Sequence, residues 1–346
     1  MNSFETMLGS SVAHLMKAPR RWLVTGCAGF IGSSLVEALL ANDQEVVGID
    51  DFSSGMPSNL AQVENKVGER RFRAFRFIEG DVRDAGACEN ACGGVEFVLH
   101  HAAIASVPLS MEQPLHVHDV NVTGTLMMLQ AARQAGVRRF VYASSSAVYG
   151  DCANDPQVED AIGSPLSPYG ATKRMNEIYG RLHAAIFGLE TIGLRYFNIY
   201  GPRQDPSGAY SAVIPKWIAS MIADQPVTIN GSNEISRDFC FIEDVVQANI
   251  LAALTGNGVA GEVFNIASGE QVTLDELFEA IRRTLSEAGQ HYPHSPVMGP
   301  YRPGDIARSS ADIGKARAGL GFERTHELAR GLAATIAYFR DQGSRI

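Results

Sequence analysis

Thr25-Gly26-Cys27-Ala28-Gly29-Phe30-Ile31-Gly32 is the stretch of sequence that decides the fold. It directly follows a short apolar run, Arg21–Thr25, and it opens an apolar stretch with helical spacing at residues 31–40. The first glycine permits a tight turn, the second lets the backbone approach a pyrophosphate, and the third lets the helix pack closely on a sheet. The amino end of that helix carries the positive pole that attracts phosphates. The stretch therefore predicts a strand, a turn and a helix built to hold a dinucleotide.

A carboxylate closes the next predicted strand. Residues 45–49 form a second short apolar run, which ends at Asp50-Asp51. An acidic residue about 20 positions beyond such a glycine stretch accepts hydrogen bonds from the adenosine ribose hydroxyls and repels a 2′-phosphate. A glycine triplet alone is also typical of an ordinary strand-to-helix turn. With Asp50 in place, we expect a site that binds NAD in preference to NADP.

The same alternation continues through the first 200 residues. Further buried strands are predicted at 75–78, 95–99, 140–143 and 190–196. Helical stretches lie between them, among them 120–134 and 169–187. Short apolar strands alternating with helices predict an α/β fold with a doubly wound parallel sheet of the Rossmann type, whose ligands bind at the carboxyl ends of the strands. Asp81 follows one such strand and suits the adenine edge, although a solvated turn aspartate is an equal interpretation.

The composition of the sequence changes after Gly201-Pro202. Glycine and proline become frequent, and helix signals appear at 274–288 and 326–340. We interpret this part as a smaller C-terminal α/β lobe for the substrate. The predicted division is an N-terminal extension over 1–20, an NAD-binding domain over 21–200, and a mainly substrate-binding region over 201–346 that is interleaved with the first domain.

Composition limits the class of partner. The formal net charge of −9 argues against nucleic acid or an anionic membrane surface as the main partner. The 5 cysteines are scattered and none pairs in metal-ligand spacing, so we expect free thiols, no metal site and a reducing cytoplasm. Residues 1–20 do not read as a signal peptide, and no apolar run approaches the length of a membrane span.

Tyr169 and Lys173 form a Y-x-x-x-K pair directly after Ser167-Pro168, a plausible helix start. Residues four apart on a helix share a face, so the phenol and the ammonium point into the same space. A nearby buried cation favours the phenolate, which predicts a tyrosine with a lowered pKa that is suited to proton transfer. The lysine can also hold the nicotinamide ribose. Such a pair is common on protein surfaces, and it gains meaning here from the glycine stretch and from the serines that follow an upstream strand.

From residue 22 to 320 the sequence resembles the extended short-chain dehydrogenases/reductases, in particular their nucleotide-sugar epimerase and dehydratase branch. The motifs that carry the resemblance are TGCAGFIG (25–32), DDFSSG (50–55), GDV (80–82), HHAA (100–103), Asn121, SSSAVYG (144–150), Tyr169 with Lys173, RYFN (195–198), RDF (237–239) and RPGD (302–305). The resemblance implies that Tyr169 is the acid/base, that Ser146 hydrogen-bonds the reacting sugar oxygen, and that Asn121 supports the active-site backbone or its ordered water.

Two sets of binding residues follow from the resemblance. Those expected to hold NAD are Gly26, Gly29, Phe30, Ile31, Gly32, Asp50, Asp51, Phe52, Ser53, Ser54, Gly55, Asp81, Val82, Ala102, Ala103, Asn121, Ser144, Tyr169, Lys173 and Tyr196. Those expected to hold a UDP-sugar are Ser106, Ser145, Ser146, Asn198, Val213, Trp217, Thr228, Asn230, Arg237, Arg302, Asp305 and Ser309. Two alternatives stay open: Arg237 and Arg302 are equally typical of solvated surface arginines, and Trp217 of plain core.

The residue before Val148-Tyr149-Gly150 indicates the type of reaction. Family members that eliminate water or decarboxylate resemble one another in an acidic residue there, and this chain has Ala147. A 4,6-dehydratase lacks its proton shuttle in such a site. What remains is reversible hydride transfer at one carbon, which is the chemistry of a 4-epimerase that returns NAD unchanged.

The sugar is inferred from Ser309. Epimerases confined to glucose and galactose resemble one another in a tyrosine four residues after the aspartate of R-x-G-D, which is Asp305 here. A serine in its place leaves room for an N-acetyl group, so we expect UDP-N-acetylglucosamine and UDP-N-acetylgalactosamine as substrates, of the kind that feed surface polysaccharide synthesis. A UDP-hexuronate 4-epimerase, with Arg308 facing the sugar carboxylate, is the alternative enzyme, and an NAD-binding sensor is the alternative of another class. The family usually dimerises through two helices, here 120–134 and 169–187, so we expect a homodimer.

Overall fold

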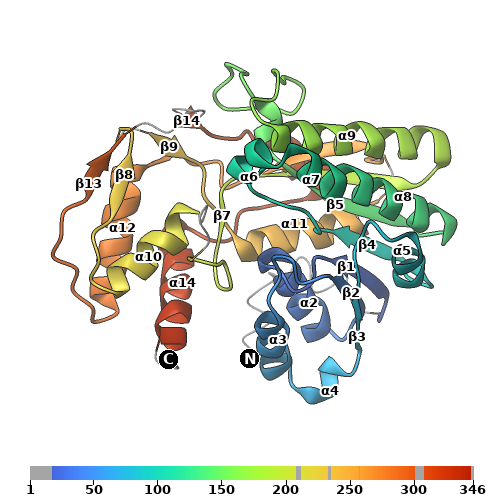
Figure 1. The fold of residues 1–346 in the computed structure, drawn as a ribbon, viewed down its shortest axis with the longest axis horizontal. Coiled ribbons are helices and arrows are strands. Elements are labelled where there is room, and N and C mark those ends of the chain that lie inside the picture. Colours follow the sequence, from blue (N-terminus) through green and yellow to red (C-terminus); the bar gives the residue numbers. More distant parts are fainter. Residues whose placement is uncertain (1–17, 208–211, 233–234, 257, 301–307, 344–346) are drawn as a thin grey trace.

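The computed structural model describes residues 18–207, 212–232, 235–256, 258–300 and 308–343. Within these residues the larger lobe is a seven-stranded parallel sheet in the order β11-β6-β5-β4-β1-β2-β3 (Figure 1). Its strands are β1 (Arg21–Thr25), β2 (Glu45–Asp50), β3 (Phe75–Glu79), β4 (Phe97–His100), β5 (Arg139–Ser145), β6 (Glu190–Tyr196) and β11 (Glu262–Ile266). The strand order reverses beside β1, which places a crevice at the carboxyl ends of β1 and β4. The predicted doubly wound parallel sheet is confirmed.

Helices cover both faces of this sheet, because its strands are apolar on both sides. Alternate residues of β1 enter different cores: Trp22 and Val24 pack with α2 on one face, and Leu23 packs with α8 on the other. The helices of this lobe are α2 (Phe30–Ala41), α3 (Pro57–Val67), α4 (Glu69–Phe72), α5 (Ala85–Cys92), α6 (Val107–Glu112), α7 (Pro114–His118), α8 (Gly124–Gln134), α9 (Pro168–Phe187) and α11 (Ile242–Leu254). The helix expected over 120–134 instead begins with a π-helical turn, η2 (Asp119–Thr123).

The smaller lobe lies beside the carboxyl ends of the strands (Figure 1). It contains α10 (Val213–Ile222), α12 (Leu274–Glu287), α14 (Leu328–Gly343) and the short strands β8 (Thr228–Asn230), β9 (Ser236–Arg237), β12 (Val272–Thr273), β13 (Val297–Gly299) and β14 (Arg308–Ser309), whereas α13 (Gly314–Leu320) packs on β11 and α11 of the larger lobe. The short strands β7 (Ile199–Tyr200) and β10 (Cys240–Phe241) pair where the chain passes between the lobes. Between the pieces of the small lobe, the chain returns to the large sheet as α11 and β11.

A buried arginine ties the amino ends of two central strands to helix α11. The Arg139 side chain, 1% exposed, forms an ion pair with Glu190 and donates to the carbonyl oxygens of Ala252 and Thr255 at 3.1 and 2.6 Å. These carbonyls belong to the last turn of α11 and the residue that ends it, where backbone acceptors lack partners within the helix. The guanidinium therefore caps the helix and joins it to β5 and β6, at the ends of the strands away from the crevice.

A buried histidine clamps the segment that leads into α14. His326 contacts Asp244 through Nδ1 at 3.2 Å and Glu243 through Nε2 at 2.9 Å, both at the start of α11. Burial disfavours the charged imidazolium, but the hydrogen bonds and charges of Asp244 and Glu243 outweigh it and raise the pKa of His326 to about 9. Within the described residues, no helix is long and apolar enough to cross a membrane.

This clamp predicts a pH dependence of stability. Because the pKa of His326 is higher in the folded chain than its ordinary value of 6.5, the stabilisation is complete below pH 6.5 and is lost as the pH rises through 9. At about 1.4 kcal/mol per pKa unit the loss is at most about 3 kcal/mol, and solvent screening of the charges lowers it. Urea unfolding at pH 6 and pH 9.5 should show this loss in the wild type, and His326→Gln should remove most of the difference. An equal pH dependence in His326→Gln would contradict the assignment.

Candidate active site

The glycine stretch borders a cavity of about 270 Å³ at the carboxyl ends of β1, β2 and β4. Gly26 has φ +64°, and a Cβ there would lie 2.9 Å from the backbone nitrogen of Ala102. A Cβ on Gly32 would collide with the carbonyl oxygen of Gly26. Both positions thus require glycine, and the turn can lie flat against the β4 loop while the amino end of α2 opens onto the cavity. A cradle of this kind fits the pyrophosphate of a dinucleotide.

Asp50 stands at the end of β2 with both carboxylate oxygens held by backbone donors. The N–H groups of Ala28 and Phe52 donate to it at 2.8 and 2.9 Å. Burial raises the pKa of Asp50, and these two hydrogen bonds oppose that rise. Since each oxygen retains a further lone pair, the carboxylate can accept hydrogen bonds from a ribose placed in the cavity.

Asp81 also borders the cavity, but it is engaged in an ion pair that the sequence did not suggest. Arg83 donates to Asp81 through Nε at 2.9 Å and to Asp119 through Nη1 at 3.0 Å. The hydrogen bonds from Arg83 hold the pKa of Asp81 below its ordinary value. The rim where an adenine would lie is therefore a fixed charged triad rather than a free carboxylate.

Most of the residues expected to hold NAD line this cavity. They are Gly26, Gly29, Phe30, Ile31, Gly32, Asp50, Asp51, Ser53, Ser54, Gly55, Asp81, Val82, Ala102 and Ala103. Six others lie outside its lining, namely Phe52, Asn121, Ser144, Tyr169, Lys173 and Tyr196. Phe52 packs against Phe77 with ring centroids 5.2 Å apart. Ten further lining residues were not expected, and two of them, Arg203 and Asp205, reach the cavity from the segment assigned to the substrate lobe.

Asn121 connects the cavity wall to the helix that carries the tyrosine and lysine. Its side chain accepts from the N–H of Ile104 at 2.8 Å and donates to the Ile104 carbonyl at 3.1 Å. It also donates to Thr172 Oγ1 at 3.2 Å, and Thr172 lies on α9 between Tyr169 and Lys173. Asn121 is fully buried, so it fixes the backbone beside the cavity rather than contacting a ligand itself.

Tyr169, Lys173 and a serine hydroxyl come together where α9 crosses the end of β5. The hydroxyl that interacts with the Tyr169 phenol belongs to Ser145, whereas the resemblance had pointed to Ser146 as the serine that hydrogen-bonds the sugar. Strand β5 continues through Ser145, whereas Ser146 begins the 3-10 turn η3 (Ser146–Tyr149). The structure thus places the hydroxyl partner of the phenol one residue earlier. Lys173 Nζ donates to the Ala143 carbonyl at 3.0 Å and lies 5.9 Å from the centroid of the Tyr169 ring.

The pKa of the phenol differs from the sequence-based expectation. Burial raises the pKa of Tyr169, and the hydrogen bond with Ser145 only partly opposes it. Burial also lowers the pKa of Lys173 to about 8. The expected lowering by the lysine is therefore wrong for the protein alone, because the desolvation of the phenol outweighs the effect of an ammonium that is committed to Ala143 O.

A hydrogen-bonded chain of side chains lies behind the same strand ends. Asn249 Nδ2 donates to Tyr196 Oη at 2.8 Å, and this hydroxyl lies 2.9 Å from His101 Nε2. Burial lowers the pKa of His101 to about 4, so the imidazole that shares this hydrogen bond with the tyrosine is neutral. Tyr196, which was expected at the cofactor, thus acts through His101, a residue of the cavity lining.

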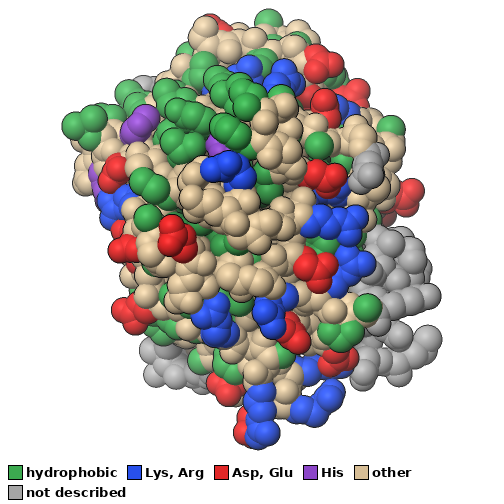
Figure 2. All heavy atoms as spheres, turned by 90° about the vertical axis from the view of Figure 1, so that its right-hand side faces the viewer, with side chains coloured by type: hydrophobic (Ala, Val, Ile, Leu, Met, Phe, Trp, Pro, Cys, Tyr) green, Lys and Arg blue, Asp and Glu red, His purple; other side chains and the backbone are tan. Residues whose placement is uncertain are grey.

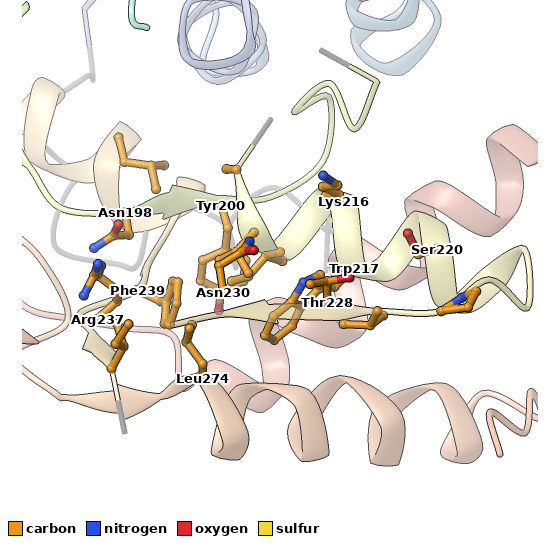
Figure 3. Close-up of a pocket in the computed structure, with 17 residues that line it drawn as sticks. Asn198, Tyr200, Lys216, Trp217, Ser220, Thr228, Asn230, Arg237, Phe239 and Leu274 are labelled. Atoms are coloured by element: carbon orange, nitrogen blue, oxygen red, sulfur yellow. The ribbon is translucent and has the colours of Figure 1, made fainter. Parts of the chain in front are cut away.

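A second cavity, of about 290 Å³, lies in the smaller lobe between α10 and β8 (Figure 3). Six residues expected to hold the UDP-sugar line it: Asn198, Val213, Trp217, Thr228, Asn230 and Arg237. Trp217 and Thr228 lie together over its middle, and Asn198 and Arg237 lie together at one end (Figure 3). Trp217 is 4% exposed, so it belongs both to the core and to the wall of the cavity. The cavity therefore has an aromatic side chain, Trp217, in its wall and a cationic side chain, Arg237, at one end.

The remaining expected substrate residues are dispersed. Ser309 lies in β14, where it pairs with Arg237 of β9, and its side chain is buried. Ser106 is the N-cap of α6, and its hydroxyl accepts from the N–H of Leu109. Arg302 and Asp305 lie outside the described residues.

The end of β5 is connected to residues beside both cavities. Ser145 pairs with Tyr196 of β6, two residues before Asn198 in the second cavity. On its other side, Tyr169 and Lys173 flank Thr172, which Asn121 connects to the wall of the first cavity. The serine, the phenol and the ammonium therefore stand between a site for a dinucleotide and a site for an anionic, ring-containing ligand.

Comparisons with known proteins agree with this geometry. Residues 22–267 match the model of the NAD dependent epimerase/dehydratase family. A UDP-glucose 4-epimerase of Mycolicibacterium smegmatis is 37% identical over 93% of this chain and 99% of its own length. The crystal structure of a UDP-glucose 4-epimerase from Thermotoga maritima with UDP-glucose is 36% identical, with a TM-score of 0.85 over 93% of this chain and 99% of that one. A UDP-N-acetylglucosamine 4-epimerase from Methanobrevibacter ruminantium, in complex with UDP-N-acetylmuramic acid, is 35% identical, with a TM-score of 0.84 over 94% and 99%.

Proposed function

This chain belongs to the NAD-dependent epimerase/dehydratase family, and from that premise we propose that it interconverts UDP-N-acetylglucosamine and UDP-N-acetylgalactosamine at the fourth sugar carbon. The general activity, that of an NAD-dependent UDP-sugar 4-epimerase, follows from its relatives, whereas the choice of sugar does not. The observation that carries the proposal is the meeting of Ser145, Tyr169 and Lys173 between the two cavities. The identity of the sugar rests on Ser309.

The residues of the first cavity fit NAD. The glycine stretch and the amino end of α2 would hold the pyrophosphate, and Asp50 would hold the adenosine ribose and disfavour a 2′-phosphate. Lys173 would hold the nicotinamide ribose from its buried position on α9. When bound, NAD would supply reversible hydride transfer at the sugar carbon.

The proton chemistry falls to the side chains at the end of β5. Tyr169 would remove the proton of the 4-hydroxyl group while the hydride leaves the fourth sugar carbon. It would return the proton when the hydride is added back. Ser145 orients the phenol and donates to the same sugar oxygen, so we assign to Ser145 the role expected for Ser146. Lys173 stabilises the phenolate that forms, since it is the cation nearest to the ring in the described site.

The absence of a second acid or base supports epimerisation rather than elimination. Ser146 and Ala147 occupy the turn η3, and neither carries a carboxylate. Dehydration requires a further proton transfer after the first oxidation, and the side chains of this turn offer none. The reaction that this site supports is therefore oxidation followed by reduction at the same carbon, with no net oxidation of the sugar.

The second cavity suits the uridine diphosphate. Trp217 offers a face and an edge to a pyrimidine, and Thr228 and Asn230 supply polar groups beside it. The guanidinium of Arg237 and the amide of Asn198 lie together at one end of the cavity, where they would bind the diphosphate. We propose Arg302 and Asp305 as further ligands, on the resemblance alone.

The short strand β14 favours the N-acetylated sugar over the uronate. Ser309 is buried and lies opposite Arg237, whereas Arg308 is exposed. Adjacent residues of a strand point to opposite faces, so Arg308 points away from the side that Ser309 faces. Arg308, the residue that the uronate alternative assigns to the sugar carboxylate, therefore does not reach that side, and Arg237, which lies opposite Ser309, is assigned to the diphosphate.

A coupled assay tests the proposal directly. Purified enzyme should interconvert UDP-N-acetylglucosamine and UDP-N-acetylgalactosamine at least as well as UDP-glucose and UDP-galactose, and UDP-glucuronate hardly at all. Chromatographic separation of the nucleotide sugars gives both the rate and the equilibrium ratio. Efficient conversion of UDP-galactose with little conversion of UDP-N-acetylgalactosamine would refute the sugar assignment. Bound NAD without turnover of any of these sugars would favour the sensor.

We propose a homodimer formed by α8 and α9. These helices expose an apolar surface that includes Met127, Met175, Ile178, Leu182 and Ile186 (Figure 2). An exposed apolar patch of this size on two adjacent helices is typical of a protein interface. Ile178→Asp is expected to convert the dimer to monomers, which light scattering on a gel-filtration column would show. Val297→Asp, at a similarly exposed apolar residue of the other lobe, is the control and should leave the mass unchanged; a monomeric wild type would contradict the proposal.

A further inference from the structure

Helix α9 meets the end of β5 through three residues, not two. Three consecutive residues of the strand each bond a residue of α9, and these partners are spaced four apart along one stripe of the helix. The Ala143 carbonyl accepts from Lys173 at 3.0 Å, and Ser145 hydrogen-bonds Tyr169. Between them, Ser144 Oγ donates to Glu177 Oε1 at 2.7 Å. The Y-x-x-x-K pair thus extends by one more turn to Glu177.

Glu177 is a buried carboxylate with a complete set of donors. It is 4% exposed, and Arg195 donates to both of its oxygens, at 2.8 and 2.9 Å. Arg174 donates to Oε2 at 2.8 Å, in addition to the hydroxyl of Ser144. A buried charge that lost these donors would be costly, so the carboxylate holds its partners in one arrangement.

The same guanidinium extends the network to the other elements of the site. Arg195 lies on β6, directly before Tyr196 and three residues before Asn198 of the uridine cavity. Its Nη1 donates to the Glu159 carbonyl at 2.9 Å, in the loop that follows η3. Glu177 therefore joins the ends of β5 and β6, helix α9 and this loop at one point below the site.

We propose that Glu177 is a positioning residue of the reaction, and that Ser144 is the contact through which it fixes the end of β5 against Tyr169 and Lys173. The proposal rests on the roles given above to Ser145, Tyr169 and Lys173. Neither Glu177 nor Ser144 need contact the sugar or NAD. Their effect is to fix how far β5 extends along α9, and hence the distance between the Ser145 hydroxyl and the phenol.

The decisive comparison is between two buried hydroxyls that both bond α9. Ser144→Ala removes the contact at the site, and Thr191→Val removes the 2.8 Å hydrogen bond from Thr191 Oγ1 to the Gly180 carbonyl, toward the other end of the same helix. Both side chains are buried, and each substitution changes little in volume. We expect similar decreases in Tm. Turnover should fall roughly tenfold or more in Ser144→Ala alone, because a small misplacement of reacting groups costs up to about 100-fold.

Two further readouts separate positioning from general destabilisation. Because the Ser145 hydroxyl lowers the pKa of Tyr169, its displacement from the phenol in Ser144→Ala should move the acid limb of the kcat/KM profile to higher pH. The KM for the UDP-sugar and the amount of bound NAD should stay at wild-type values. Equal kcat and equal pH profiles in Ser144→Ala and Thr191→Val would overturn the proposal. A wild type without epimerase activity would instead refute the proposed function.

A second pair of variants tests the carboxylate itself. Glu177→Gln keeps the shape and removes the charge, and Glu190→Gln does the same to the partner of Arg139 at the far ends of β5 and β6. We expect both variants to unfold earlier, with a fall in kcat for the folded protein only in Glu177→Gln. A fall in kcat of the same size in Glu190→Gln would also overturn the proposal. If Glu177→Gln does not fold, the comparison of the hydroxyl variants decides.

Discussion

Tyr169→Phe is expected to lower turnover of the UDP-sugar roughly 10²–10⁴-fold, the range associated with a single general acid/base. The substitution removes one oxygen and leaves Lys173 Nζ on the Ala143 carbonyl. Since the glycine-rich cavity and Lys173 are unchanged, the variant should retain NAD. The rate is measured by separating the nucleotide sugars, and the cofactor by the ratio of absorbance at 260 and 280 nm.

The matched control for this variant is Tyr179→Phe. Tyr179 lies on the same helix, ten residues further on, and packs against the core on the α8 face of the sheet. The same oxygen is removed there without a change near Ser145, so turnover should stay at the wild-type rate. Wild-type turnover in Tyr169→Phe would remove the phenol from the mechanism. Loss of NAD together with turnover would instead make Tyr169 a cofactor ligand.

Features that depend on neighbouring residues in the chain were predictable from the sequence. The glycine stretch, the strand before it and the helix after it form one local unit, and Gly26 and Gly32 are required by contacts within or next to that unit. Asp50 closes the adjacent strand, and the alternation of strands and helices determines which strands lie parallel. The family match over residues 22–267 adds the chemistry that local patterns cannot provide.

Features that depend on the exact end of a strand or on distant contacts were not predictable. Three serines in a row do not reveal that β5 includes Ser145, and that one-residue difference decides which hydroxyl faces Tyr169. Arg203 lines the cofactor cavity although it follows β7, and an ion pair of 2.6 Å between its Nη1 and Glu37 Oε2 of α2 holds it there. A contact between residues so far apart in the chain leaves no pattern in the sequence. The pKa of Tyr169 depends on burial, which is a property of the folded chain.

The substitution Ser309→Tyr is expected to reverse the preference between sugars. Ser309 is buried in β14 beside Arg237, a residue that lines the second cavity, and we expect a phenol at this position to fill the space proposed for the N-acetyl group. Conversion of UDP-N-acetylgalactosamine should fall roughly 10- to 100-fold relative to conversion of UDP-galactose. A steric clash between the introduced ring and the N-acetyl group would disfavour that sugar by about 1–3 kcal/mol. The ratio of kcat/KM for the two sugars is the quantity to measure.

The neighbouring position provides the control, because β14 turns adjacent side chains to opposite faces. Arg308 is exposed, so Arg308→Tyr introduces the same ring one residue away without entering the pocket, and the ratio of kcat/KM should stay at the wild-type value. A tyrosine at 309 that lowers conversion of both sugars equally would indicate overpacking of the strand rather than selection of the sugar. If the ratio stayed unchanged in Ser309→Tyr, the N-acetyl group would have to lie elsewhere, and the choice of sugar would return to the residues around Ser145 and Asn198.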